Sequence, residues 1–121
     1  MDKSRRKELL EQYKEIKTYM GVVRVKNKVN GKIFINSYPN LKNKWLMIRM
    51  QLQLGQFVNA ELQNDWNKLG ADAFEYEELE RKEADKVTDM RWELKQMLRK
   101  WLERLRPYGD QGYNKPPRDM T

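Results

Sequence analysis

Hydrophobic residues that favour β-strands gather in two short runs near the start of the chain. Residues 22–26 and 33–35 are rich in valine, isoleucine and phenylalanine, which favour β-strands. Asn30-Gly31 lies between the two runs, and both residues tolerate the positive φ that tight turns require. The pattern predicts an antiparallel hairpin.

After the hairpin, apolar residues recur at the spacing of amphipathic helices. A first helix is expected to begin after Asn40, its predicted N-cap, and to end at Gly55. Its apolar stripe consists of Leu41, Trp45, Ile48 and Leu52. A second helix is expected between Asn59 and Gly70. Its predicted buried stripe consists of Leu62, Trp66 and Leu69.

A third strand and a long helix are predicted in the second half. Residues 73–79 alternate aromatic and acidic side chains, and Glu75 and Glu77 are expected to face solvent at a sheet edge. The final helix is expected from about Asp85 to Leu105. At the ends, residues 1–19 predict an N-terminal helix that packs on the domain or docks a partner, and residues 115–121 predict a disordered tail.

Composition excludes several kinds of chemistry. The 121 residues include no Cys and no His, so disulfides, Cys/His zinc sites and His-based catalysis are excluded. The length fits one domain. No apolar segment follows the charged start and no run could span a bilayer, so a cytoplasmic protein without a membrane partner is expected.

The net charge of +7 is distributed unevenly along the chain. Residues 21–60 contain seven basic and no acidic residues, whereas residues 61–90 contain ten acidic and four basic residues. A segment that carries only positive charge is typical of a nucleic-acid-binding surface, although such charge also serves solubility. The seven predicted contact residues are Arg24, Lys26, Lys28, Lys32, Lys42, Lys44 and Arg49.

Two tripeptides carry a family resemblance. Gly21-Val22-Val23 and Phe34-Ile35-Asn36, ten residues apart, resemble the paired motifs of the GIY-YIG endonuclease family. The segments 37–41, 62–70, 73–77 and 112–114 match the family in order, so the resemblance covers residues 20–114. It implies an α+β fold, with a small three-stranded antiparallel sheet flanked by helices and here preceded by the N-terminal helix. DNA is a more plausible partner than RNA under this resemblance.

The resemblance also assigns catalytic positions, and most of them carry other residues here. The two catalytic tyrosines correspond to Val23 and Phe34, the arginine to Lys44 and the magnesium-binding glutamate to Leu98, whereas Asn114 is retained. Valine and phenylalanine have no hydroxyl group, and leucine cannot coordinate magnesium. Lysine keeps a positive charge but not the planar fork of arginine. We therefore expect no catalytic residues and no metal or other cofactor.

Three functional hypotheses follow. The first is a catalytically inactive GIY-YIG-like domain that binds nucleic acid through the basic residues of 24–49. The second is a protein-interaction module that uses the acidic segment 61–89 or the N-terminal helix. The third is a divergent metal-dependent endonuclease whose ligands come from other positions.

Overall fold

The computed structural model describes residues 17–117. The predicted N-terminal helix lies outside these residues except for its last three positions, and Tyr19 already belongs to the first strand. Residues 118–121 of the predicted tail also lie outside the described range. Both assignments stay predictions.

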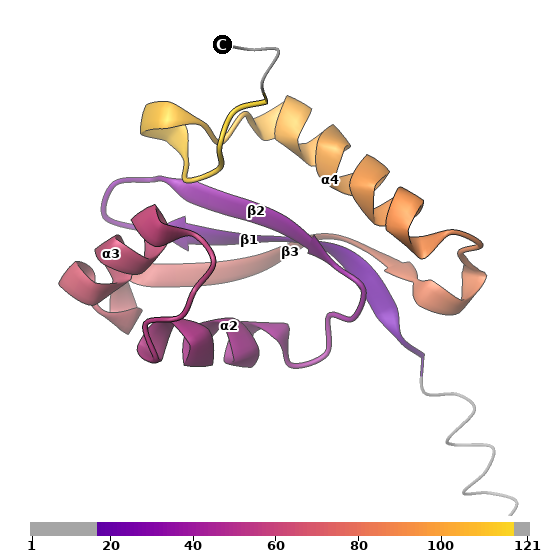
Figure 1. The fold of residues 1–121 in the computed structure, drawn as a ribbon, viewed down its shortest axis with the longest axis horizontal. Helices are drawn as coiled ribbons and strands as arrows, with labels where there is room; N and C mark the ends of the chain where they lie inside the picture. The colour runs from indigo at the N-terminus through magenta and orange to yellow at the C-terminus, as the bar shows by residue number, and fades with distance from the viewer. Residues whose placement is uncertain (1–16, 118–121) are drawn as a thin grey trace, which may run out of the picture.

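An antiparallel sheet of three strands forms the centre of the domain (Figure 1). β1 (Tyr19–Asn27) is the middle strand, with β2 (Ile33–Tyr38) on one side and β3 (Phe74–Glu83) on the other. The predicted hairpin and third strand are confirmed, although β2 extends through Tyr38 into a segment expected to be loop. β1 is rich in valine because it has a neighbouring strand on each side and helices over both faces.

The hairpin turn forms where Asn30-Gly31 predicts it. Gly31 has φ 79°, a value that a residue without a Cβ adopts freely. Its N–H donates to the Asn27 carbonyl at 2.8 Å, and the Asn30 side chain accepts from the Lys32 N–H at 2.9 Å. The turn therefore fixes the register in which Val25 lies opposite Phe34.

Gly21, the first residue of the first tripeptide, lies against the backbone of β3. The β1–β3 register shifts between Val22 and Val23, which marks a β-bulge. A Cβ on Gly21 would lie 2.0 Å from the carbonyl oxygen of Glu80 and 3.0 Å from Cδ1 of Leu41. Glycine is therefore required here for close backbone packing.

Two short helices follow the hairpin. α2 (Lys44–Gln53) begins four residues after Asn40, so the predicted N-cap is wrong. The Asn40 side chain instead accepts from the N–H of Lys42 at 3.0 Å, which forms a turn before the helix. α3 (Ala60–Leu69) has Asn59 as its N-cap, as predicted, but Leu69 is 44% exposed and does not belong to the buried stripe.

The last helix, α4 (Met90–Leu105), begins later than expected. Asp89 caps it by accepting from the N–H of Trp92 at 3.1 Å, and a 3₁₀ turn (Ala84–Lys86) occupies the predicted first turn. Two further 3₁₀ turns, Ala71–Ala73 and Gly109–Gln111, precede β3 and follow α4. Among residues 17–117, none of the helices has the length and hydrophobicity that crossing a bilayer requires.

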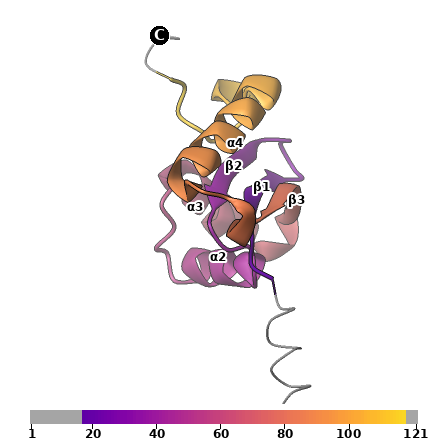
Figure 2. The same ribbon diagram turned by 90° about the vertical axis from the view of Figure 1, so that its right-hand side faces the viewer.

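The sheet separates two apolar clusters. α2 and α3 cover one face and α4 covers the other, which Figure 2 shows with α4 above the strands and α2 below them. The first cluster is built around Val25, Phe34 and Trp66. The second is built around Met20, Val22 and Met97. The confirmed architecture is an α+β domain with a small antiparallel sheet flanked by helices.

Candidate nucleic-acid interface

The two positions that the family resemblance assigns to catalytic tyrosines are buried. Val23 is 1% exposed on β1 and pairs with Asn36 on β2. Phe34 is 7% exposed and packs edge-on against Phe57, with their ring centroids 5.4 Å apart. Neither side chain carries an atom that can accept a proton from water. General base catalysis from these two positions is therefore excluded.

Two other tyrosines lie on the same face of the sheet as Phe34, and the sequence analysis did not single them out. Tyr76 stacks on Trp45 at a centroid distance of 5.3 Å, and its hydroxyl is buried without a hydrogen-bond partner. Burial, and secondarily the nearby carboxylate of Glu78, raises the pKa of Tyr76 to about 12. Burial also raises the pKa of Tyr38. Both phenols are protonated at neutral pH, so they do not replace the missing general base.

Lys44 and Arg49 of α2 lie against aromatic rings of this layer. The Lys44 ammonium lies 4.4 Å from the ring centroid of Tyr38, and the Arg49 guanidinium lies 5.4 Å from the ring of Trp45. Nε of Arg49 is buried and has no hydrogen-bond partner. The start of α2 therefore presents a cation on an aromatic surface, as phosphate-binding surfaces often do.

Leu98 lies on the opposite side of the sheet from Phe34. It packs on α4 against the apolar cluster of Met20 and Met97. Glu93, on the same helix, is paired with Lys82. Among residues 17–117, no group of three carboxylate, histidine or cysteine side chains is placed to hold a metal ion. The described residues therefore do not fit a magnesium site.

Asn114, the retained position, holds the chain segment after α4 against the sheet. Its side chain accepts from the Ile35 N–H and donates to the Ile35 carbonyl, both at 2.9 Å. Gly112 forms a parallel bridge with Ile33 on the same strand. These contacts give Asn114 a structural role at the edge of β2.

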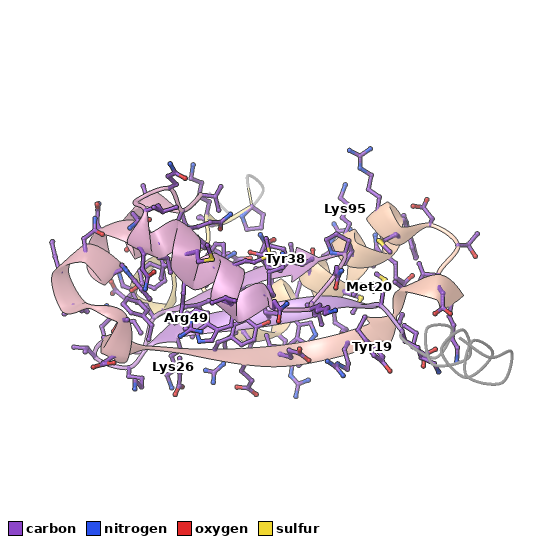
Figure 3. The ribbon with its side chains drawn as sticks, turned by 90° about the horizontal axis from the view of Figure 1, so that it is seen from below. Tyr19, Met20, Lys26, Tyr38, Arg49 and Lys95 are labelled. Carbon is purple, nitrogen blue, oxygen red and sulfur yellow. The ribbon has the colours of Figure 1, made fainter. Side chains whose placement is uncertain are left out.

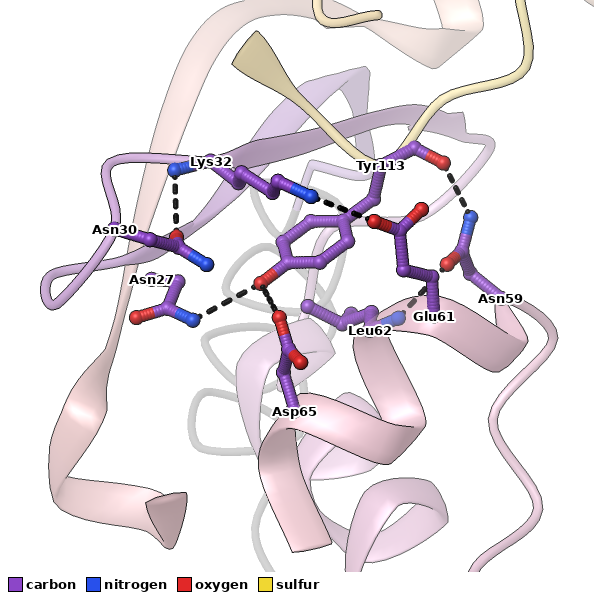
Figure 4. A network of polar contacts seen from close by, with 8 residues as sticks. All are labelled: Asn27, Asn30, Lys32, Asn59, Glu61, Leu62, Asp65 and Tyr113. Carbon is purple, nitrogen blue, oxygen red and sulfur yellow. Dashed lines mark hydrogen bonds and ion pairs between the residues drawn. The ribbon is translucent and has the colours of Figure 1, made fainter. Parts of the chain in front are cut away.

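Tyr113 is the centre of a buried polar network (Figure 4). Its hydroxyl donates to Oδ2 of Asp65 at 2.6 Å and accepts from Nδ2 of Asn27 at 3.0 Å. The Asn59 side chain donates to the Tyr113 carbonyl at 2.8 Å. Burial and the hydrogen bond to Asp65 raise the pKa of Tyr113 to about 12. The network joins the hairpin, α3 and the segment after α4.

Several of the predicted basic contact residues are paired with acids. Arg24 binds Glu77 at 2.6 Å and lies 3.6 Å from Glu75, so these two glutamates have a cationic partner. Lys32 binds Glu61 at 2.7 Å. Glu77 of β3 lies 53 residues from Arg24 in the sequence, and Glu61 of α3 lies 29 residues from Lys32. The neutralised pairs contribute less to a positive surface than the composition of residues 21–60 indicates.

The remaining predicted cations lie on different parts of the molecule. Lys26 shares a face of β1 with Arg24, opposite the face that α2 covers. Figure 3 shows Lys26 on the β3 side of the domain and Tyr38 on the β2 side. Among residues 17–117, Lys26, Lys28, Lys42 and Lys44 have no ion-pair partner. The structure thus brings Lys42 and Lys44 together at the start of α2 and separates them from the hairpin residues.

Comparison with solved structures identifies the class of fold. The chain has the fold of the GIY-YIG nuclease catalytic domains, so the predicted resemblance is confirmed at the level of fold. It is similar to the catalytic domain of the homing endonuclease I-TevI, with 24% identity and a TM-score of 0.66, over 81% of this chain and 99% of that one. A mutant of the catalytic domain of the intron endonuclease I-TevI gives 25% identity and a TM-score of 0.65, over 79% of this chain and 92% of that one. No protein-family model and no curated protein matches the chain.

Proposed function

We propose that this domain binds DNA without cleaving it, through the surface around the start of α2. One observation carries the binding: Lys44, at the position of the family's arginine, lies over the ring of Tyr38 without an acidic partner among residues 17–117. Lys42, which is exposed two residues earlier, adds a second cation. The fold of nuclease catalytic domains supports the choice of DNA as the ligand.

The side chains at the catalytic positions support the absence of cleavage. Val23 and Phe34 are buried hydrocarbons, and Leu98 belongs to an apolar cluster. Hydrolysis of a phosphodiester requires activation of water and stabilisation of the developing charge, which these groups do not supply. The divergent-nuclease hypothesis predicts the opposite, namely plasmid nicking in magnesium or manganese that stops when a chelator is added.

Fluorescence anisotropy tests the binding. Labelled duplex, branched and single-stranded DNA are titrated with the protein at several salt concentrations, and we expect Kd values of about 10⁻⁴ to 10⁻⁶ M at physiological salt. Lys42→Ala/Lys44→Ala should reduce the slope of log K against log salt by about 1.8, since each lost phosphate contact contributes ~0.9. The control Lys68→Ala/Lys86→Ala removes the same charge from other elements. Absence of binding at low salt would refute the proposal.

The protein-interaction alternative is favoured by a different feature of α2. Four large apolar side chains are at least half exposed here. Three belong to α2 and one follows its last residue: Leu46, Met47, Met50 and Leu54. An exposed apolar stripe of this kind often contacts another protein. A second copy of the chain is the simplest partner. Sedimentation equilibrium would then show self-association that Met47→Ser/Met50→Ser abolishes, and the lysine substitutions would have no effect.

A further inference from the structure

α4 borders a groove that the proposed function does not use. The groove has a volume of about 480 Å³ and lies between α4 and the segment that contains Tyr108. Leu98 and Leu102 contribute apolar walls. Its charged residues are three cations and one acid, namely Lys95, Arg99, Arg106 and Glu103. The groove therefore has apolar walls, and most of the charged side chains around it are positive.

The cations of the groove continue a stripe along α4. Arg91, Lys95 and Arg99 follow one another at intervals of four residues, so they share one side of the helix and lie about 6 Å apart along its axis. All three are exposed. The carboxylate of Glu103 lies 3.9 Å from Arg99, and both side chains are at least 70% exposed, so this ion pair is weak and a phosphate can compete with Glu103 for the guanidinium.

The stripe on α4 and the start of α2 cover opposite faces of the sheet but lie toward the same edge, which β2 forms. The segment after α4, whose Tyr108 lines the groove, is hydrogen-bonded to Ile35 through Asn114. On the same strand, Tyr38 carries the ammonium of Lys44 over its ring. Figure 3 shows Lys95 and Tyr38 toward the same edge of the sheet, away from β3. Cations of α2 and α4 thus flank the β2 edge from its two faces.

The groove also contains the position of the missing metal ligand. Leu98 occupies the position that the family resemblance assigns to the magnesium-binding glutamate, and Lys95 and Arg99 lie on either side of it in the sequence. Positive side chains repel a divalent cation and attract a phosphate directly. The local charge is therefore opposite in sign to that of a carboxylate site.

We propose that Lys95 and Arg99 bind backbone phosphates of DNA beside Leu98, where cationic side chains stand in place of a metal ion. This inference rests on the proposed function and extends its surface from α2 across the β2 edge to α4. Together with Lys42 and Lys44, the two residues give the domain four phosphate contacts. Binding through these residues does not require a divalent metal.

A matched pair of variants tests the role of α4. Lys95→Ala/Arg99→Ala removes one lysine and one arginine from the groove. Lys100→Ala/Arg104→Ala removes the same charges from the same helix but away from the groove, where Lys100 binds Glu80 at 2.7 Å and Arg104 lies over the ring of Trp101. Circular dichroism and thermal unfolding verify that each variant is folded. DNA binding is then measured by anisotropy across a salt series, with and without EDTA.

The outcomes separate this inference from the proposed function. We expect the groove variant to bind DNA about tenfold or more weakly and to reduce the salt slope by about 1.8, with the control close to wild type and no effect of EDTA. If the wild-type protein binds DNA and the groove variant binds it equally well, the inference is overturned and the proposed function stays intact. Absence of wild-type binding would overturn both. Loss of affinity for an acidic peptide, with DNA binding unchanged, would assign the groove to a protein partner and overturn the inference.

Discussion

The hydroxyl group of Tyr113 gives the sharpest test of how the hairpin, α3 and the segment after α4 are held together. Tyr113→Phe removes one oxygen atom and leaves the ring in place. The oxygen donates to Asp65 at 2.6 Å and accepts from Asn27 at 3.0 Å. Asn27 is 0% exposed, so its Nδ2 group would lose its hydrogen bond in a place that water does not reach.

The expected cost follows from these two partners. A buried donor left without a partner costs about 1–3 kcal/mol. Asp65 is partly exposed, so water replaces much of its lost hydrogen bond. We therefore expect Tyr113→Phe to lower the free energy of unfolding by about 2–3 kcal/mol. For a domain of this size, the melting temperature should fall by roughly 8–20 °C.

Urea denaturation followed by tryptophan fluorescence measures this cost, and Tyr76→Phe is the matched control. The Tyr76 hydroxyl is buried without a hydrogen-bond partner, so its removal should leave stability unchanged or raise it. The reasoning would be refuted if Tyr113→Phe lay within about 0.5 kcal/mol of wild type, which is the scatter expected of neutral substitutions. The reasoning would also be refuted if Tyr76→Phe lowered the free energy of unfolding as much as Tyr113→Phe does.

The difference in stability between wild type and Tyr113→Phe should depend on pH. Burial and the bond to Asp65 raise the pKa of Tyr113 from 10.0 to about 12, so folding favours the protonated phenol. This contribution to stability is complete below pH 10 and is lost as the pH rises from 10 to about 12. The stability difference between wild type and Tyr113→Phe should therefore narrow over that interval, because the variant has no phenol at this position.

Two further substitutions test other parts of the fold. Gly21→Ala should lower the free energy of unfolding by about 3 kcal/mol or more, because its Cβ would lie 2.0 Å from the Glu80 carbonyl oxygen, and chemical denaturation measures the loss. Glu80→Gln tests how stability depends on pH in the acidic range. Burial of Glu80 opposes ionisation, but hydrogen bonds from Lys100 and Trp101 outweigh it and lower the pKa below 4.5. The stability that ionised Glu80 contributes is present above pH 4.5 and is lost as the pH falls through the lowered pKa. Glu80→Gln should therefore lose less free energy of unfolding than wild type when the pH is lowered. Equal losses in wild type and variant would contradict this role of Glu80.

The hairpin was predictable because its signals are local, and the class of fold followed from short motifs in order along residues 20–114. Asn30-Gly31 fixes the turn, and the valine-rich and isoleucine-rich runs on either side form the paired strands. Helix starts were less predictable, since Asn40 and Asp85 are both plausible caps by residue type. The observed start of α4 depends on Asp89, whose carboxylate accepts the Trp92 N–H.

The candidate interface was less predictable than the fold, because it depends on contacts between distant segments. Charge counts along residues 21–60 could not reveal that Glu77, on another strand, neutralises Arg24, or that Glu61 neutralises Lys32. The roles of Tyr38 and Tyr76 also depend on which face of the sheet α2 covers. The four-residue spacing of the α4 cations was visible in the sequence, but the groove beside Leu98 was not.

The contacts along β2 limit which other chains this domain can join. β2 is an edge strand, and such strands tend to pair with a strand of a neighbouring molecule. Here the Ile33 carbonyl accepts from Tyr113, both backbone groups of Ile35 bind Asn114, and the Ser37 N–H binds the side chain of Asn36. These four backbone groups are therefore not available to a further strand. Occupation of both backbone groups of Ile35 and of the Ile33 carbonyl therefore opposes sheet extension and fibril growth along this part of β2.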